Sequence, residues 1–169
     1  SDAYIKVYKT ESARAERSIM DMISKAERDD IYYADIADNI SDWILLYSRV
    51  SSLQRKYPEG LQGKREFAVF EAKDYSSLKD TAYTRATEAL YDEALYLVKM
   101  PGNAPKNISK ALENLKRAKK YSRHLDNEIN SLGAETAYNA AEALAYTNKP
   151  DNLLQASEYY MLANSWIPG

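Results

Sequence analysis

The chain has 169 residues, of which 28% are charged, and its formal net charge is -2. A chain of this length suits one compact domain with a real core, because about two-thirds of the unfolded surface leaves water at this size. The balanced charge predicts no strong attraction to nucleic acid or anionic membranes, and the absence of cysteine excludes disulfides, thiolate metal sites and cysteine nucleophiles.

The first expected helix covers residues 3–29, a stretch that contains neither glycine nor proline. Its apolar residues recur at helical spacing from Ile5 to Ala26, which predicts one buried face. The stretch that follows, 29–39, is mainly polar, and we interpret it as a connection that tucks its few apolar side chains inward.

A second helix is expected from a cap at Asn39 or Ser41 as far as Tyr57, because Pro58 cannot continue it. The next stretch, Gly60–Asp74, breaks the helical pattern. Its aromatic and aliphatic residues favour an irregular or extended linker, and a short helix is the alternative.

Four more helices are expected in the rest of the chain. A loop with two prolines and a glycine, 99–105, separates the first two of them. The third helix is expected to be capped by Asp74 or Ser76. The expected ranges are 74–98, 107–122, 126–147 and 152–166.

Three of these helices share one pattern, in which an asparagine is interpreted as the N-terminal cap. Asn39, Asn107 and Asn152 are each followed by apolar or small residues at offsets of four, eight and eleven. The last two copies are 45 residues apart. A lone helical hairpin cannot bury its apolar stripe, so neighbouring hairpins must stack. The sequence therefore predicts an all-α, single helical-repeat domain of stacked antiparallel hairpins: 3–58, a linker at 59–74, 75–122 and 127–167.

The last two hairpins carry a recognisable series of small and bulky residues. In each hairpin, a small residue in the first helix is followed in the second helix by alanine, then leucine or tyrosine, then alanine. A proline closes the last of the two hairpins. The residues are Ala94, Ala111, Leu115 and Ala118, then Ala141, Ala156, Tyr160, Ala163 and Pro168. This series resembles the tetratricopeptide (TPR) repeat, although that family repeats at about 34 residues. Its style is also similar to repeat regions of uncharacterised bacterial envelope lipoproteins.

The resemblance implies a right-handed TPR-like solenoid that acts as a non-catalytic protein–protein interaction scaffold. Such proteins present a concave helical face to a peptide or protein partner, and the first helix of each hairpin lines that face. The matching positions here are Glu88, Tyr91, Leu95, Val98, Glu135, Tyr138, Glu142 and Ala145. The alternative is a bacterial envelope protein that binds a small apolar or sugar-like ligand in a Tyr-lined pocket.

The sequence offers no convincing catalytic or metal-binding motif. His124 is the single histidine, and we interpret it as solvated or as a helix-end residue, because catalysis or metal binding needs convergent donors. The acidic residues between Asp29 and Asp42 lack the glycine turn of a calcium loop, and helix capping explains most of them. We therefore expect no enzyme activity, no cofactor and no metal.

Basic residues gather between Lys106 and Arg123. They can be interpreted as a site for phosphate or an acidic partner, or as a solvated helix face. We favour the solvated face and expect no nucleic-acid partner, because stacking aromatic residues do not interleave. No apolar run approaches the roughly 18 residues of a membrane span. A start at Ser1 and an end at Pro168-Gly169 suggest a fragment of a longer protein, which we expect in a bacterial periplasm or envelope.

Overall fold

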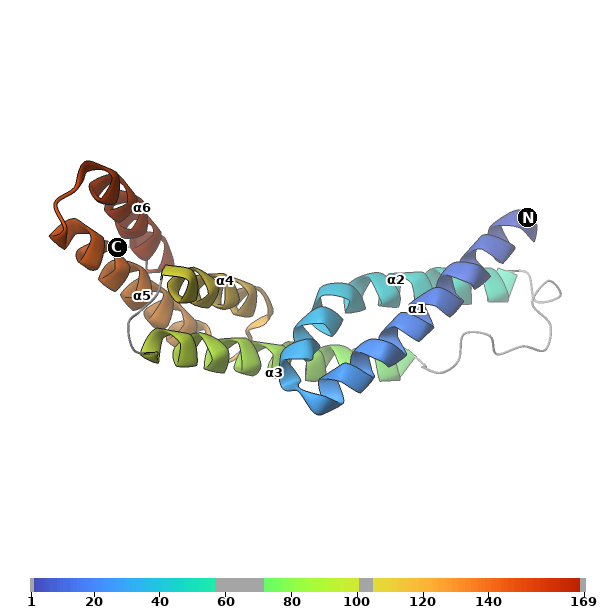
Figure 1. The fold of residues 1–169 in the computed structure, drawn as a ribbon. Helices are drawn as coiled ribbons and strands as arrows, with labels where there is room; N and C mark the ends of the chain where they lie inside the picture. Colours follow the sequence, from blue (N-terminus) through green and yellow to red (C-terminus); the bar gives the residue numbers. More distant parts are fainter. Residues whose placement is uncertain (1, 57–71, 101–104, 168–169) are drawn as a thin grey trace. The chain divides into compact units, whose positions relative to one another are not determined.

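The computed structural model describes residues 2–56, 72–100 and 105–167, and these form six α-helices and one short 3-10 helix (Figure 1). The helices pack in sequential antiparallel pairs, consistent with stacked hairpins, so the predicted all-α class is confirmed. The elements are α1 (Asp2–Arg28), η1 (Asp30–Tyr32), α2 (Tyr33–Lys56), α3 (Ala72–Lys99), α4 (Pro105–Tyr121), α5 (Asp126–Tyr146) and α6 (Pro150–Trp166).

The chain divides into two compact units, Ser1–Ala86 and Thr87–Gly169, and α3 contributes its first half to one and its second half to the other. None of the described helices is both long enough and apolar enough to cross a membrane.

In the first unit, α1 packs against α2 through apolar side chains that are buried along the pair. The first part of α3 joins them, and the rings of Tyr47 on α2 and Tyr75 on α3 lie 5.1 Å apart between centroids. The most deeply buried side chains of α1 and α2 are Ile19, Ala26, Ala34, Ile36, Ile40 and Val50.

The expected connection at 29–39 is wrong, because α2 already begins at Tyr33. The side chain of Asp29 accepts a hydrogen bond from the backbone N–H of Ile31 at 3.1 Å, and this cap starts the short helix η1. That helix leads directly into α2. Asn39 therefore lies inside α2, where its amide donates to the carbonyl oxygen of Asp35 at 2.8 Å.

The proposed asparagine caps at Asn107 and Asn152 are also wrong. Helix α4 begins at Pro105 and α6 at Pro150, which makes each asparagine the third residue of its helix. Proline suits the first position of a helix, since its missing N–H has no partner there and its φ angle is already helical. Because these prolines are 45 residues apart, the repeat is marked by Pro-x-Asn.

Each of these two asparagines bonds to the segment that precedes its helix. The Asn107 amide lies 3.7 Å from the sulfur of Met100, and the Asn152 amide donates to the hydroxyl of Thr147 at 2.8 Å. The amides therefore hold each helix to the end of the helix before it, which explains why the spacing repeats without a capping role.

The remaining expected boundaries agree with the structure to within a few residues. Helix α3 begins at Ala72, slightly before the expected cap at Asp74 or Ser76. Residues 59–71 of the expected linker lie outside the described residues. Pro168, the proline that was expected to close the last repeat, also lies outside them.

The second unit contains the end of α3 followed by α4, α5 and α6. Helix α5 packs closely against α6 and also against α4. Helix α4 also contacts α3, where Glu93 accepts a hydrogen bond from Asn114 at 2.8 Å and pairs with Lys110 at 3.2 Å. Small side chains dominate the core and let the helix axes approach. The fully buried alanines are Ala94, Ala111, Ala118, Ala137 and Ala141.

Candidate functional site

Described residues of the second unit line two neighbouring hollows, which share Glu135 of α5. The first, which we name the four-helix groove, has a volume of about 490 Å³ and is lined by residues of α3, α4, α5 and α6. Its bulkier apolar lining residues are Leu95, Val98, Ile108, Leu132, Leu144 and Tyr159. The larger polar side chains that border it are Lys99, Glu135, Asn139 and Gln155.

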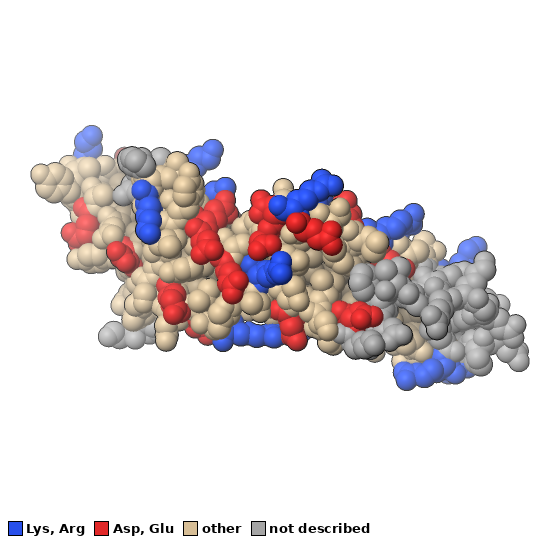
Figure 2. All heavy atoms as spheres, turned by 90° about the horizontal axis from the view of Figure 1, so that it is seen from below, with Lys and Arg blue, Asp and Glu red and all other residues tan. Residues whose placement is uncertain are grey.

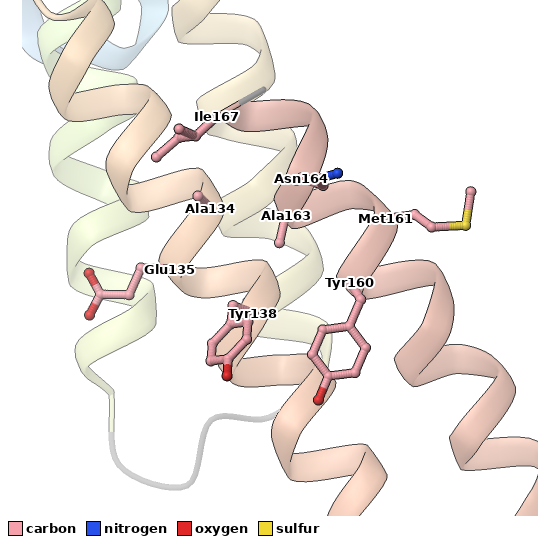
Figure 3. A pocket seen from close by; sticks show the side chains of 8 residues that line it. All are labelled: Ala134, Glu135, Tyr138, Tyr160, Met161, Ala163, Asn164 and Ile167. Carbon is pink, nitrogen blue, oxygen red and sulfur yellow. The ribbon is translucent and has the colours of Figure 1, made fainter. Parts of the chain in front are cut away.

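The second hollow, which we name the α5–α6 hollow, is a shallower and more open space of about 620 Å³ (Figure 3). Tyr138 on α5 and Tyr160 on α6 lie side by side along it, with their ring centroids 5.7 Å apart in an edge-to-face arrangement. Ala134 and Ala163 form part of its floor, and Met161 points away from it.

One carboxylate holds the two tyrosines of the α5–α6 hollow. The Tyr160 hydroxyl donates to Glu142 at 2.5 Å, and this hydrogen bond, with burial and the carboxylate's charge, raises the pKa of Tyr160 to about 12. A hydrogen bond with Glu142 and the same negative charge raise the pKa of Tyr138 too. Both phenols therefore stay protonated near neutral pH and act as hydrogen-bond donors and packing surfaces, not as bases or nucleophiles.

The structure distributes the eight sequence-predicted groove residues over several places. Leu95, Val98 and Glu135 line the four-helix groove, and Glu135 also borders the α5–α6 hollow beside Tyr138. The remaining members lie outside both linings. They are Glu88, Tyr91, Glu142 and Ala145.

Sequence reasoning missed most of the α5 lining of the four-helix groove. Leu132, Thr136, Asn139 and Ala143 follow one another at steps of four, three and four, so they form a second stripe on α5. The alanine stripe beside it, which packs in the core, is the stronger pattern in the sequence. It alone was interpreted as the apolar face of this helix. A search for two stripes on one helix would have found it.

His124 lies in a defined contact. Its Nε2 atom lies 3.1 Å from a carboxylate oxygen of Glu88, and both side chains remain about half exposed. This pair links α3 to the turn that leads into α5. Such an exposed pair stabilises a fold by no more than about 1 kcal/mol.

Basic residues of α4 take part in contacts within the second unit. Lys110 pairs with Glu93 at 3.2 Å, and the Lys119 ammonium lies 5.3 Å from the ring centroid of Trp166. On the described part of the face shown in Figure 2, basic and acidic side chains are interspersed. A mixed surface of this kind offers no broad field of one sign to a polyanion.

The acidic residues around the first turn of the chain have structural roles. Asp29 caps η1, and Asp30 pairs with Arg85 at 3.5 Å. Within residues 2–56, 72–100 and 105–167, no three His, Asp or Glu side chains come together in a way that could hold a metal ion.

Comparison with known proteins gives no relative for this arrangement. No family model matches the sequence, and neither a curated protein nor a solved structure matches it significantly. The all-helical assignment, with six helices packed sequentially, therefore rests on the structure itself.

Proposed function

We propose that the protein is a non-catalytic interaction module that binds an apolar segment of a peptide or protein partner in the four-helix groove. The observation that carries this proposal is the groove itself, about 490 Å³ of mainly aliphatic lining drawn from four helices. This volume lies within the range of roughly 300–1,000 Å³ that is usual for ligand sites. Leu95 and Val98 are only half-buried in the absence of a partner, so binding removes further apolar surface from water.

The size of the groove suits one or two large apolar side chains of a partner. Full burial of a leucine or phenylalanine is worth about 1.5–3 kcal/mol. Such anchors, placed in a preformed groove, supply most of the affinity of many interfaces. The groove therefore favours a partner with closely spaced aliphatic or aromatic residues.

The polar groups around the groove suit a peptide backbone. Asn139 and Gln155 each carry an amide that both donates and accepts hydrogen bonds, as a peptide group does. Lys99 and Glu135 add one charge of each sign, which favours one orientation of a bound segment. No histidine lines the groove, and His124 is engaged with Glu88. These features support binding without chemistry.

The repeat character belongs to the same proposal. Hairpins α3–α4 and α5–α6 are interpreted as two copies of a TPR-like unit in a right-handed array. Support comes from the 45-residue spacing of Pro105 and Pro150, and of the buried residues Ala111 and Ala156.

A small apolar or sugar-like ligand is the second candidate for the groove. The volume favours it, and Tyr159 offers an aromatic surface with a hydroxyl group. A thermal-shift screen with small molecules tests this candidate, because a ligand that binds only the folded protein raises its apparent stability.

The peptide proposal is tested by selection from a random-peptide library. Leu132→Asp places a charge in the groove, and Leu154→Asp is the control, since Leu154 is 67% exposed and lies outside the groove. We expect the selected peptides to be rich in apolar residues and to lose roughly tenfold or more in affinity for L132D, about 1.4 kcal/mol. Equal affinity for L132D and the wild type would contradict the proposal, provided that circular dichroism shows both to be folded.

A further inference from the structure

The four-helix groove and the α5–α6 hollow are neighbours, and Glu135 of α5 is the residue that their linings share. Tyr138, three residues further along α5, lines the hollow, and Tyr160 of α6 lies beside it. Figure 3 shows Glu135, Tyr138 and Tyr160 in this order across the two helices. A partner segment that fills the groove and continues past Glu135 therefore meets a carboxylate first and two aromatic rings next.

The carboxylate of Glu135 calls for a cation. The residue is exposed, and among the residues that the structure describes it has no hydrogen bond or ion pair. Lys149 is the only basic residue in the sequence of this hairpin between positions 126 and 167. The acidic residues of the same stretch are Asp126, Glu128, Glu135, Glu142, Asp151 and Glu158. A partner with a positive charge at this border is therefore electrostatically complementary to it.

The ring of Tyr138 offers a second contact to the same cation. The residue is 51% exposed, so its ring is accessible from the hollow. Its hydroxyl makes a hydrogen bond with Glu142. A phenol that donates to a carboxylate gains electron density in its ring, and an electron-rich ring attracts a cation over its face more strongly. The carboxylate of Glu142 thus supports the cation indirectly, through the ring.

The chemistry of this border favours arginine over lysine. A guanidinium group is planar, stacks on aromatic rings and pairs with a carboxylate through two parallel hydrogen bonds. The aliphatic stem of an arginine also covers small apolar residues such as Ala134 and Ala163, which form part of the floor of the hollow. The ammonium group of lysine is a compact, strongly hydrated charge without this planar geometry, so it makes fewer of these contacts.

We propose that the partner segment in the four-helix groove carries an arginine beside its apolar residues, and that this arginine pairs with Glu135 and stacks on Tyr138 in the α5–α6 hollow. This inference rests on the proposed function, because the apolar residues hold the segment in the groove. The arginine adds specificity. An apolar segment without it still binds, but less tightly.

Peptides selected from a random library on the wild-type protein serve as the probe. We expect arginine to be enriched in them at a fixed distance from the apolar positions. Each selected peptide is then compared with a version in which citrulline replaces that arginine, because citrulline keeps the shape and loses the charge. We expect the wild-type protein to bind the citrulline version about fivefold more weakly or worse, measured at about 0.15 M salt, where distant charges are largely screened.

Variants of the protein assign this loss of affinity to the hollow. Glu135→Gln and Tyr138→Leu should each reduce the difference between the arginine and citrulline peptides, as contacting residues do in a double-mutant cycle. Tyr138→Phe keeps the ring and should retain most of the difference. Glu158→Gln, an exposed change on α6 that lies outside both linings, is the control and should leave the difference unchanged.

Selected peptides without enriched arginine, or equal affinity for the arginine peptide and its citrulline or lysine version, would overturn the inference. A loss that E135Q and Y138L leave unchanged would overturn it too. If such peptides still lose affinity for L132D, the groove proposal stands without the arginine. Peptides that bind L132D and the wild type equally would overturn both. The citrulline comparison needs no change in the protein, so a variant that fails to fold does not affect it.

Discussion

The indole of Trp166 lies directly on the backbone of Gly133, so that a Cβ atom at position 133 would stand 2.5 Å from the ring carbon Cδ2. The contact joins the end of α6 to the first half of α5. Trp166 is only 6% exposed, and the Lys119 ammonium lies over its ring at 5.3 Å. Close packing of the Trp166 ring thus explains why a glycine occupies position 133 inside α5.

Gly133→Ala should destabilise the protein. Alanine improves helix propensity by about 1 kcal/mol, but the overlap with a fixed aromatic ring costs about 1–3 kcal/mol. We expect a net loss of about 1 kcal/mol, measured by urea denaturation. Ser131→Ala, an exposed change two residues earlier, is the control and should not lower stability. A G133A variant more stable than the wild type would contradict the contact.

Asp29→Ala should cost about 1 kcal/mol of unfolding free energy, because the residue caps the turn that starts η1 and α2. Asn39→Ala should be neutral or slightly stabilising, since Asn39 lies inside α2 and alanine is the better helix former. Thermal or urea denaturation of both variants decides where the helix begins. The opposite order of stabilities would restore Asn39 as the cap.

Leu115→Ala should be among the most damaging single changes in the second unit. The side chain is 0% exposed, and truncation of a buried leucine costs about 2–5 kcal/mol. Leu154→Ala removes the same atoms from a position that is 67% exposed, and should cost less than about 0.5 kcal/mol. Similar losses for the two variants would mean that α4 is not the centre of this core.

The tyrosines held by Glu142 predict a loss of stability at high pH. The pKa of Tyr160 is raised from 10.0 to about 12, so the folded protein retains the phenolic proton more tightly than the unfolded chain does. The resulting stabilisation is complete below pH 10 and disappears as the pH rises from 10 to about 12.

Glu142→Gln tests this relation, because it removes the carboxylate and should lower the pKa of Tyr160 toward 10.0. Ultraviolet absorbance of tyrosinate, followed from pH 8 upward, measures the change. Tyr75 titrates in the same range, because burial is the main cause that raises its pKa to about 12, so the difference between the variant and the wild type is the quantity to compare. Glu158→Gln, an exposed change on α6, is the control. An E142Q titration identical to that of the wild type would refute the role of Glu142.

The helices and their buried faces followed from periodicity, because apolar spacing reports directly on which side of a helix meets its neighbour. Ala111, Leu115 and Ala118 were expected on one face and are all fully buried. Helix starts were less predictable. Asparagine and proline both signal the start of a helix. In α4 and α6 the helix begins at the proline, Pro105 or Pro150, two positions before the asparagine.

The candidate site was only partly predictable. Leu95, Val98 and Glu135 line the four-helix groove, and their expected role in binding a partner stays a prediction. Their partners Ile108 and Tyr159 come from the second helices of the two hairpins, and which of these residues converge depends on how the hairpins stack. The contact of Trp166 with Gly133 depends in the same way on packing between helices.

Methyl NMR of the protein with a selected apolar peptide tests the groove most directly. We expect chemical-shift changes confined to the methyl groups of five residues that line the four-helix groove: Leu95, Val98, Ile108, Leu132 and Leu144. The methyl groups of Leu153 and Leu162, two exposed residues of α6 that do not line the groove, should not move. Shifts at those two residues without any in the groove would show that the peptide binds elsewhere on the protein.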